Sequence, residues 1–274
     1  MPTHPQPRLT IPKLLALRRE QKIVCLTAYT APMARLLDSD VDILLVGDSL
    51  GMVLYGYDST LPVSLDMMVE HGRAVVKASA RAMVVVDLPF GSYQQSPAQA
   101  FASAARLMVE TGCGAVKLEG GEEMAETIQF LVARGIPVMA HIGMTPQSVH
   151  RFGSYRARGR NDAESQQLSR DMAAIHAAGA FAVVIENVLE EVATPLVQAV
   201  DILTIGIGAS AACSGQVLVT EDICGFESRF HPRFVKTYGN LGAEVQIIAR
   251  AYAQEVRAQQ FPDADHVTSQ IRGK

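Results

Sequence analysis

Cysteine is scarce in this chain, and the few cysteines are scattered. Cys25, Cys113, Cys213 and Cys224 form no CxxC pair. Their spacing therefore indicates neither a disulfide framework nor a zinc site. Unpaired cysteines are typical of proteins kept in a reducing compartment, so we expect a cytoplasmic protein.

The chain also lacks an excess of positive charge and any long apolar run. Its 24 Lys and Arg residues against 28 Asp and Glu residues give a formal net charge of −4. This balance argues against a nucleic-acid partner. No apolar stretch approaches the ~18 residues of a membrane span, and the polar start MPTHPQPRLT does not resemble a signal peptide. We therefore expect no membrane partner.

The sequence does contain a series of short apolar segments that alternate with helical patterns. Near-continuous Val, Ile and Leu runs are typical of parallel strands covered on both faces. Such runs predict strands at residues 23–28, 41–46, 82–88, 115–119, 137–141, 181–186, 201–208 and 215–219. Helical patterns lie between most of them, and a further one at 245–256 is expected to close the fold.

This alternation over 274 residues, with no linker, predicts an α/β fold: a single (β/α)8 TIM barrel domain over residues 1–274. We expect residues 1–9 and 261–274 to be loose ends. A doubly wound sheet is the alternative fold. Its Gly-rich opening turn is missing after the first predicted strand, where the sequence reads TAYTAP.

Several predicted strands end on a charged or ionisable residue. These residues are Asp48, Asp87, Lys117, Glu119, His141 and Glu186. A charge inside a buried strand is costly, whereas the C-terminal ends of strands are where α/β barrels build their active sites. The pattern therefore predicts an enzyme whose active site lies at the C-terminal ends of the strands.

Asp48, Asp87 and Glu119 are hard oxygen ligands from three different strand ends. Mg²⁺ prefers such ligands and leaves positions for substrate and water. Three adjacent carboxylates without a cation would repel one another, so the set predicts a magnesium site. The alternative is that each aspartate only caps the helix or turn that follows it.

Lys117, Glu186 and His141 are the other candidates. Lys117 lies two residues before Glu119, so both side chains point to one face. A buried lysine needs an anion, which a substrate carboxylate or enolate would supply, and an internal Lys–Asp pair is the alternative. Glu186 follows apolar residues, so we expect apolar surroundings, which suit a general base, and a structural role is the alternative. His141 would bind substrate, orient that base, or be a core histidine.

Longer strings in the sequence match one known family. They are LTAYTAPMA, LLVGDSLGMV, YDSTLPVSLDMM, DLPFGSY, AVKLEGG, AHIGMTPQSV, IGIGA and GQVLV. In order and spacing they resemble the ketopantoate hydroxymethyltransferase family from about Thr10 to Tyr252. The resemblance implies a (β/α)8 barrel that requires Mg²⁺, and a homodecamer built as a pentamer of dimers.

The resemblance also implies a reaction. In this family a hydroxymethyl group passes from 5,10-methylenetetrahydrofolate to 3-methyl-2-oxobutanoate through a Mg²⁺-stabilised enolate. The product is 2-dehydropantoate, and the step is the first committed one of pantothenate and coenzyme A biosynthesis.

Matched position by position, the family's roles fall on residues that the strand ends had already selected, with one addition. The metal ligands are Asp48, Asp87 and Glu119; the substrate-binding set is Asp48, Ser49, Asp87, Lys117 and His141; the proton acceptor is Glu186. Three positions depart from the family pattern: Ser210, Ser214 and Arg158 stand where a glycine, an aspartate and a glutamine are usual. Ser210 and Ser214 are expected near the barrel rim, where they would affect folate-side binding or loop geometry.

Two other functions fit parts of the sequence. A lyase or mutase of the phosphoenolpyruvate mutase type also binds Mg²⁺ and 2-keto acids in a barrel, but it needs no folate. A barrel that has lost catalysis and serves as a binding module is the non-enzyme alternative. The intact set of ionisable strand ends argues against it.

Overall fold

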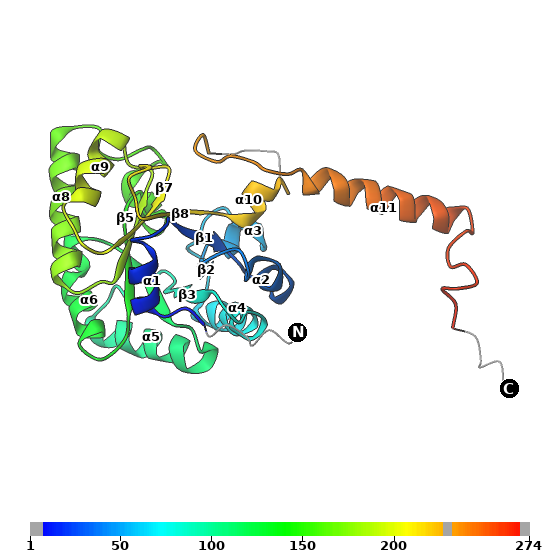
Figure 1. Cartoon of the computed structure of the whole chain (residues 1–274), viewed down its shortest axis with the longest axis horizontal. Helices are drawn as coiled ribbons and strands as arrows, with labels where there is room; N and C mark the ends of the chain where they lie inside the picture. Colours follow the sequence, from blue (N-terminus) through cyan, green and yellow to red (C-terminus); the bar gives the residue numbers. More distant parts are fainter. Residues whose placement is uncertain (1–7, 227–231, 269–274) are drawn as a thin grey trace. The chain divides into compact units, whose positions relative to one another are not determined.

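Eight parallel strands form a closed barrel in the computed structural model, which describes residues 8–226 and 232–268 (Figure 1). The strands are β1 (Ile23–Thr27), β2 (Ile43–Val46), β3 (Met83–Asp87), β4 (Ala115–Glu119), β5 (Val138–Gly143), β6 (Ala182–Glu186), β7 (Leu203–Ile207) and β8 (Gly215–Leu218). Each strand pairs with its neighbour in the sequence, and β8 pairs with β1, with Ile23 opposite Gly215. The prediction of a (β/α)8 barrel is confirmed.

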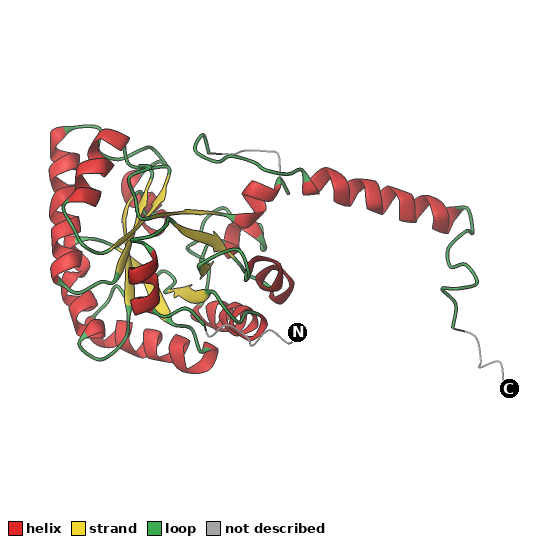
Figure 2. Cartoon of the chain, in the orientation of Figure 1, coloured by secondary structure: helices red, strands yellow, loops and turns green. Residues whose placement is uncertain are grey.

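Helices follow the strands and lie outside the barrel (Figure 2). They are α2 (Ala31–Leu37), α3 (Leu50–Val53), α4 (Leu65–Ala78), α5 (Pro97–Thr111), α6 (Ala125–Val132), α7 (Val149–Phe152), α8 (Asp162–Ala177) and α9 (Glu190–Gln198), with short 3₁₀ turns η1 (Glu122–Met124) and η2 (Pro146–Ser148). Ser64 and Ser96 cap α4 and α5, because their side chains accept hydrogen bonds from the backbone N–H groups of Met67 and Gln99. β7 and β8 are joined by turns at 208–214 rather than by a helix.

Alternate residues along each strand serve two separate cores. Outward-facing residues such as Val84, Val116 and Ile185 belong to the cluster between the strands and the helices. Inward-facing residues such as Val85 and Ile205 form a second cluster inside the barrel. Since side chains alternate along a strand, the inward row continues on β3 to Asp87 and on β4 to Lys117 and Glu119.

An additional helix, α1 (Ile11–Leu17), lies at the start of the described chain. Its Leu14 is fully buried and belongs to the cluster inside the barrel. The chain before it is anchored as well, because Leu9 N–H donates to the carbonyl oxygen of Arg81 and the Arg8 guanidinium donates to the carbonyl oxygen of Ala82. Of the ends that we expected to be loose, 1–7 and 269–274 lie outside the described residues.

The internal contacts divide the chain into two units, Met1–Thr220 and Glu221–Lys274. The second unit contains most of α10 (Thr220–Cys224) and all of α11 (Leu241–Arg257). Asn240 caps α11 through its side chain, and the ring of Tyr252 contacts that of Phe261, with centroids 5.4 Å apart. The pairing of β8 with β1 closes the sheet without α11. A single domain over residues 1–274 stays a prediction.

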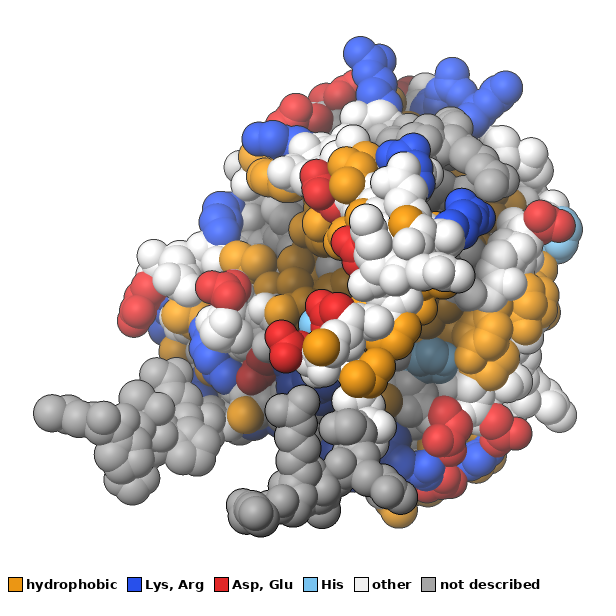
Figure 3. Space-filling view, turned by 90° about the vertical axis from the view of Figure 1, so that its right-hand side faces the viewer, with side chains coloured by type: hydrophobic (Ala, Val, Ile, Leu, Met, Phe, Trp, Pro, Cys, Tyr) orange, Lys and Arg blue, Asp and Glu red, His pale blue; other side chains and the backbone are white. Residues whose placement is uncertain are grey.

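The surface and the helices bear on two further expectations. On the face shown in Figure 3, acidic and basic side chains both occur among apolar ones, in keeping with the net charge of −4. None of the helices in the described ranges is long and apolar enough to cross a membrane.

Candidate active site

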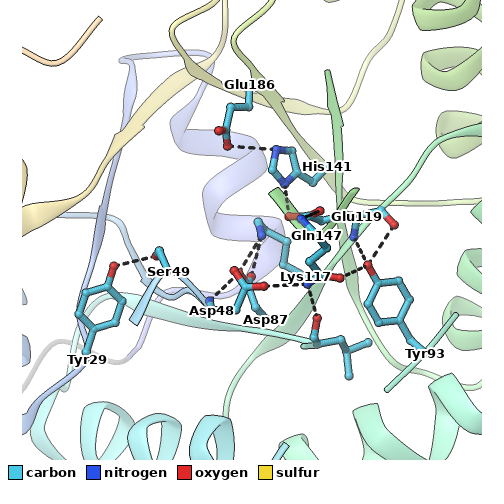
Figure 4. A network of polar contacts seen from close by, with 11 residues as sticks. Tyr29, Asp48, Ser49, Asp87, Tyr93, Lys117, Glu119, His141, Gln147 and Glu186 are labelled. Atoms are coloured by element: carbon cyan, nitrogen blue, oxygen red, sulfur yellow. Dashed lines mark hydrogen bonds and ion pairs between the residues drawn. The ribbon is translucent and has the colours of Figure 1, made fainter. Parts of the chain in front are cut away.

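The ionisable residues selected from the sequence meet at the C-terminal end of the barrel (Figure 4). Asp87 and Glu186 end β3 and β6, Lys117 and Glu119 lie on β4, and His141 lies on β5. The pairing register places Asp87 opposite Lys117 and Glu119 opposite His141. Asp48 and Ser49 follow β2, and Asp48 N–H donates to Asp87 Oδ2 at 3.1 Å. Ser49 Oγ lies 2.8 Å from the Tyr29 hydroxyl.

Lys117 forms a buried ion pair with Asp87. Its Nζ lies 2.8 Å from each carboxylate oxygen, and both side chains are at most 6% exposed. Burial alone would lower the pKa of Lys117, but the carboxylates of Asp87, Glu119 and Asp48 outweigh it and hold the pKa above its usual value. The structure thus shows the Lys–Asp pair that the sequence left as an alternative. It also leaves Lys117 positively charged in the site.

The pKa of Asp48 reflects its burial and the repulsion among the carboxylates of this site. Its side chain is buried beside two other carboxylates, and one lysine balances only part of their charge. Burial first, and then Asp87 and Glu119, raise the pKa of Asp48 to about 8. Without an added cation, burial and the neighbouring carboxylates therefore favour the protonated form of this group.

His141 lies between two carboxylates on the other side of the site. Its Nδ1 is 3.4 Å from Glu119 Oε1 and its Nε2 is 3.3 Å from Glu186 Oε2, so both are ion-pair contacts longer than ordinary hydrogen bonds. Burial would lower the pKa of His141, but the two carboxylates outweigh it and raise the pKa to about 9. The raised pKa favours an imidazolium between Glu119 and Glu186.

The surroundings of Glu186 differ from the expected ones. Apolar residues precede it on β6, but its side chain is 20% exposed and its carboxylate faces His141. The expectation of an apolar environment was wrong, because the carboxylate contacts the His141 ring and part of the side chain is exposed to solvent. The group is a partly exposed carboxylate with a cationic neighbour.

The sequence did not single out Gln147 and Tyr93, which hold this site together. Gln147 Nε2 donates to Asp48 Oδ2 at 2.8 Å, and its backbone N–H donates to Glu119 Oε2 at 2.9 Å. The Tyr93 hydroxyl donates to Gln147 Oε1 at 2.7 Å and accepts from Glu119 N–H at 3.1 Å. Both are neutral residues in loops, so no strand-end pattern pointed to them.

A cavity of about 360 Å³ opens beside His141. The glycine-rich turn after β4, the turn after β5 and the N-terminal half of α8 line it. Two of the four arginines in the loop after β5, Arg151 and Arg158, reach it. The Arg158 guanidinium carbon lies 4.4 Å from the centroid of the Phe152 ring, and a nitrogen lies 3.5 Å from Glu164.

Ser210 and Ser214 have partners close by in the fold. Ser210 is buried, and its Oγ lies 2.8 Å from Thr194 Oγ1, whereas Ser214 Oγ lies 3.2 Å from Thr204 Oγ1. A Cβ atom at Gly206 would lie 2.8 Å from the Gln216 side chain, so close packing accounts for that glycine. These contacts favour a packing role for the segment between β7 and β8.

The carboxylates of Asp48, Asp87 and Glu119 suit Mg²⁺ in charge and in ligand type, but they do not form a complete coordination site. Within residues 8–226 and 232–268, no three His, Cys, Asp or Glu side chains are grouped to hold a metal ion. Mg²⁺ is usually held by only one or two carboxylates, with water and substrate completing its octahedron. The buried negative charge and the raised pKa of Asp48 fit a divalent cation bound in that way.

Comparisons with known proteins agree with the site. The family model of ketopantoate hydroxymethyltransferase matches residues 8–264. A protein from Rhodospirillum centenum named 3-methyl-2-oxobutanoate hydroxymethyltransferase is 58% identical over 260 residues, which cover 95% of this chain and 94% of that protein. A protein of the same name from Rhizobium etli is 59% identical over 261 residues, covering 95% and 96%.

Solved structures show the same fold at low sequence identity. Phosphoenolpyruvate phosphomutase from Streptomyces platensis subsp. rosaceus has a TM-score of 0.61 and 13% identity, covering 95% of this chain and 92% of that one. A phosphonopyruvate hydrolase determined with oxalate and Mg²⁺ has a TM-score of 0.59 and 14% identity, covering 96% and 93%. The family match, in contrast, is close and spans nearly the whole sequence, and it confirms the resemblance seen in the motifs. The chain belongs to the ketopantoate hydroxymethyltransferase family and is an enzyme of the transferase class.

Proposed function

We propose that this enzyme transfers a hydroxymethyl group from 5,10-methylenetetrahydrofolate to 3-methyl-2-oxobutanoate, giving 2-dehydropantoate for pantothenate and coenzyme A biosynthesis. The observation that carries the proposal is the pairing of two features at one barrel mouth. A buried cluster of Asp48, Asp87, Glu119 and Lys117 lies on one side, and the His141–Glu186 pair lies on the other. The relatives at 58% and 59% identity bear the corresponding name.

Asp48, Asp87 and Glu119 would hold Mg²⁺, directly or through water. When bound, the ion supplies Lewis acidity to the keto acid and so acidifies the C–H bond next to the ketone. Lys117 adds a fixed positive charge one layer deeper, where it favours negative charge on the substrate. Ser49 lies beside Asp48 and would contact the substrate, with its hydroxyl oriented by Tyr29.

Glu186 is the group placed to take the proton. In the proposed reaction the C3–H bond breaks, and its proton passes to the Glu186 carboxylate. Water adds to the methylene carbon of the folate and both C–N bonds of that carbon break, so tetrahydrofolate leaves with the two protons of water and formaldehyde remains. The electron pair left on C3 attacks the formaldehyde carbon, and the resulting alkoxide oxygen takes the proton back from Glu186 to become the new hydroxyl group. His141, held between Glu119 and Glu186, would orient the base and contact the substrate.

Lys117 would act as a charge and not as a nucleophile. A lysine amine must be deprotonated to form an imine, and the Asp87 ion pair opposes that by raising the pKa of Lys117. Borohydride added with the keto acid should therefore trap no adduct on the protein. A stable mass increase equal to the reduced keto acid on Lys117 would contradict this role.

A turnover assay with defined substrates tests the proposal. The purified enzyme with Mg²⁺ and 3-methyl-2-oxobutanoate should form 2-dehydropantoate only when 5,10-methylenetetrahydrofolate is present. Phosphonopyruvate and 2,3-dimethylmalate, which appear in the names of two solved neighbours, test the phosphoenolpyruvate mutase alternative. Turnover of one of those acids without folate, in place of hydroxymethyl transfer, would overturn the proposal.

The cellular setting and the assembly are also proposals. All four cysteines are free, three of them buried, which suits a reducing compartment and a cytoplasmic enzyme. The family resemblance supports a homodecamer arranged as a pentamer of dimers. Light scattering that showed a 29.5 kDa monomer at micromolar concentration would contradict the decamer.

A further inference from the structure

We propose that Gln147 is a positioning residue, which sets the carboxylates of Asp48 and Glu119 for Mg²⁺ without binding the ion itself. The inference rests on the proposed function, because it concerns the same metal site. Gln147 lies in the 3₁₀ turn η2 after β5, and the residue is only 6% exposed. It contacts two of the three candidate ligands, one through its side chain and one through its backbone.

Every hydrogen-bonding position of the Gln147 side-chain amide is in use. Oε1 accepts from the Tyr93 hydroxyl at 2.7 Å and from Gln94 Nε2 at 3.0 Å. Nε2 donates to Asp48 Oδ2 at 2.8 Å and to the Leu88 carbonyl oxygen at 3.0 Å. An amide has two acceptor lone pairs and two donor hydrogens, so these four contacts satisfy it fully. The reversed amide would place its oxygen against two acceptors, and this fixes the N–H group toward Asp48.

The contacts of Gln147 also tie several strand ends together. Asp48 follows β2, Leu88 follows β3, Glu119 ends β4, and Gln147 itself follows β5. One residue therefore links the loops after four neighbouring strands. Because two of these bonds end on the carboxylate oxygens of Asp48 and Glu119, a shift of Gln147 would change the direction in which both groups present their remaining lone pairs.

A neutral amide suits this position better than a charged side chain. The surrounding group already holds three carboxylates and one lysine. A glutamate at 147 would add a further negative charge, and a lysine would compete with the metal ion for the same oxygens. An amide donates to Asp48 without altering the charge that the cation has to balance. Residues that orient metal ligands in this way typically contribute about 10–100-fold to metal affinity or activity.

The first experiment compares Gln147→Met with Gln94→Met as a matched control. Both variants lose an amide from the same network, but only Gln147 touches the carboxylates. Isothermal titration of metal-free protein with Mg²⁺ or Mn²⁺ should show about 10–100-fold weaker binding for Gln147→Met. Gln94→Met should bind within about twofold of the parent protein. Thermal unfolding of both metal-free variants establishes that they fold.

A double-mutant cycle with Asp48→Asn separates positioning from a general structural role. If Gln147 acts through Asp48, the double variant Asp48→Asn, Gln147→Met should have nearly the same metal affinity as Asp48→Asn alone. The inference would be overturned if the affinity losses of the two single variants multiplied in the double variant. It would also be overturned if Gln147→Met bound the metal ion as tightly as the parent protein. A parent protein that binds neither ion would instead refute the proposed metal site. One set of results therefore refutes the role of Gln147, and a different result refutes the proposed metal site.

Discussion

The two ends of the barrel interior are built from the same strands, yet they differ completely in chemistry. On β3, Met83 and Val85 belong to the apolar cluster inside the barrel, and Asp87 follows at the same two-residue spacing. On β4, Ala115 belongs to that cluster, and Lys117 and Glu119 follow it. One inward-facing row thus begins apolar and ends ionisable.

The difference assigns separate tasks to the two ends. At the apolar end, Leu14 of α1 joins the interior cluster and is fully buried. At the other end, burial raises the pKa of Asp48 to about 8, and Asp87 and Glu119 add to this effect. The raised pKa means that the charged form of Asp48 is unfavourable there. The apolar end therefore stabilises the fold. The buried charges at the ionisable end lower that stability and would serve the reaction.

Glu186→Gln should have the largest effect on the ionisable end. Loss of a general base typically lowers the rate by about 10²–10⁴-fold. The variant should still bind Mg²⁺ and 3-methyl-2-oxobutanoate, but it should fail to exchange the C3 proton of the keto acid in deuterium oxide. Proton NMR of the keto acid measures this exchange directly.

The exposed Glu190 on α9 provides a matched control, since Glu190→Gln removes the same charge away from the site. It should exchange the C3 proton like the parent protein. Exchange at the parental rate in Glu186→Gln would move the base elsewhere, with His141 as the next candidate.

Lys117→Met should destabilise the metal-free protein by about 3–5 kcal/mol, because removal of one partner from a buried ion pair leaves the other charge uncompensated. Asp87 and Asp48 would then lie in the interior without the lysine, and the His141 ring contacts only Glu119 of the three carboxylates. Added Mg²⁺ should restore part of the loss. Urea unfolding with and without Mg²⁺ measures both effects.

The exposed Lys77 at the end of α4 serves as the control, and Lys77→Met should change stability little. Equal stability of Lys117→Met and the parent protein in the absence of Mg²⁺ would show that the ion pair carries no net stability. The contrast between the two ends of the barrel would then be weaker than we infer.

Metal affinity should depend on pH through Asp48. Burial, Asp87 and Glu119 raise the pKa of Asp48 to about 8, so Mg²⁺ has to displace a proton at pH 7. Affinity should rise by up to roughly tenfold per pH unit below pH 8 and level off above it, as expected for release of one proton. Calorimetry in buffers of different ionisation enthalpy counts the protons released.

The raised pKa of Asp48 also predicts how the stability of the metal-free protein changes with pH. The folded state keeps a proton on Asp48 up to about pH 8, whereas the unfolded chain releases it near pH ~4, where an aspartate in water ionises. Asp48 should therefore lower the free energy of unfolding as the pH rises from about 4 to about 8, and Asp48→Asn should remove that slope. A flat profile in the parent protein would contradict the assigned pKa.

The sequence predicted the barrel and the residues that share its mouth for one physical reason. Asp87, Glu119 and Glu186 each end an apolar run, and the C-terminal ends of parallel strands meet at one end of a barrel. Their chemical roles stay predictions.

Other parts of the molecule carried no comparable signal. Gln147 is a neutral residue in a loop, and its importance comes from contacts with residues far away in sequence. The short helix α1 has only seven residues, so its apolar positions could not be distinguished from an irregular start. The environment of Glu186 was predicted from its own strand, whereas His141 on the neighbouring strand determines it.

Ile205→Val should have the smallest effect and tests the apolar end alone. Ile205 on β7 is fully buried in the interior cluster, and loss of one methylene there should cost about 0.5–1.5 kcal/mol of unfolding free energy. Because no ionisable residue of the site lies on β7, Mg²⁺ affinity and C3 proton exchange should stay within about twofold of the parent values, as for independent sites. Urea unfolding, metal titration and exchange can be measured on one preparation. A loss of metal affinity that accompanies this small loss of stability would show that packing at the apolar end controls the carboxylates, and the two ends would then have to be treated as one coupled unit.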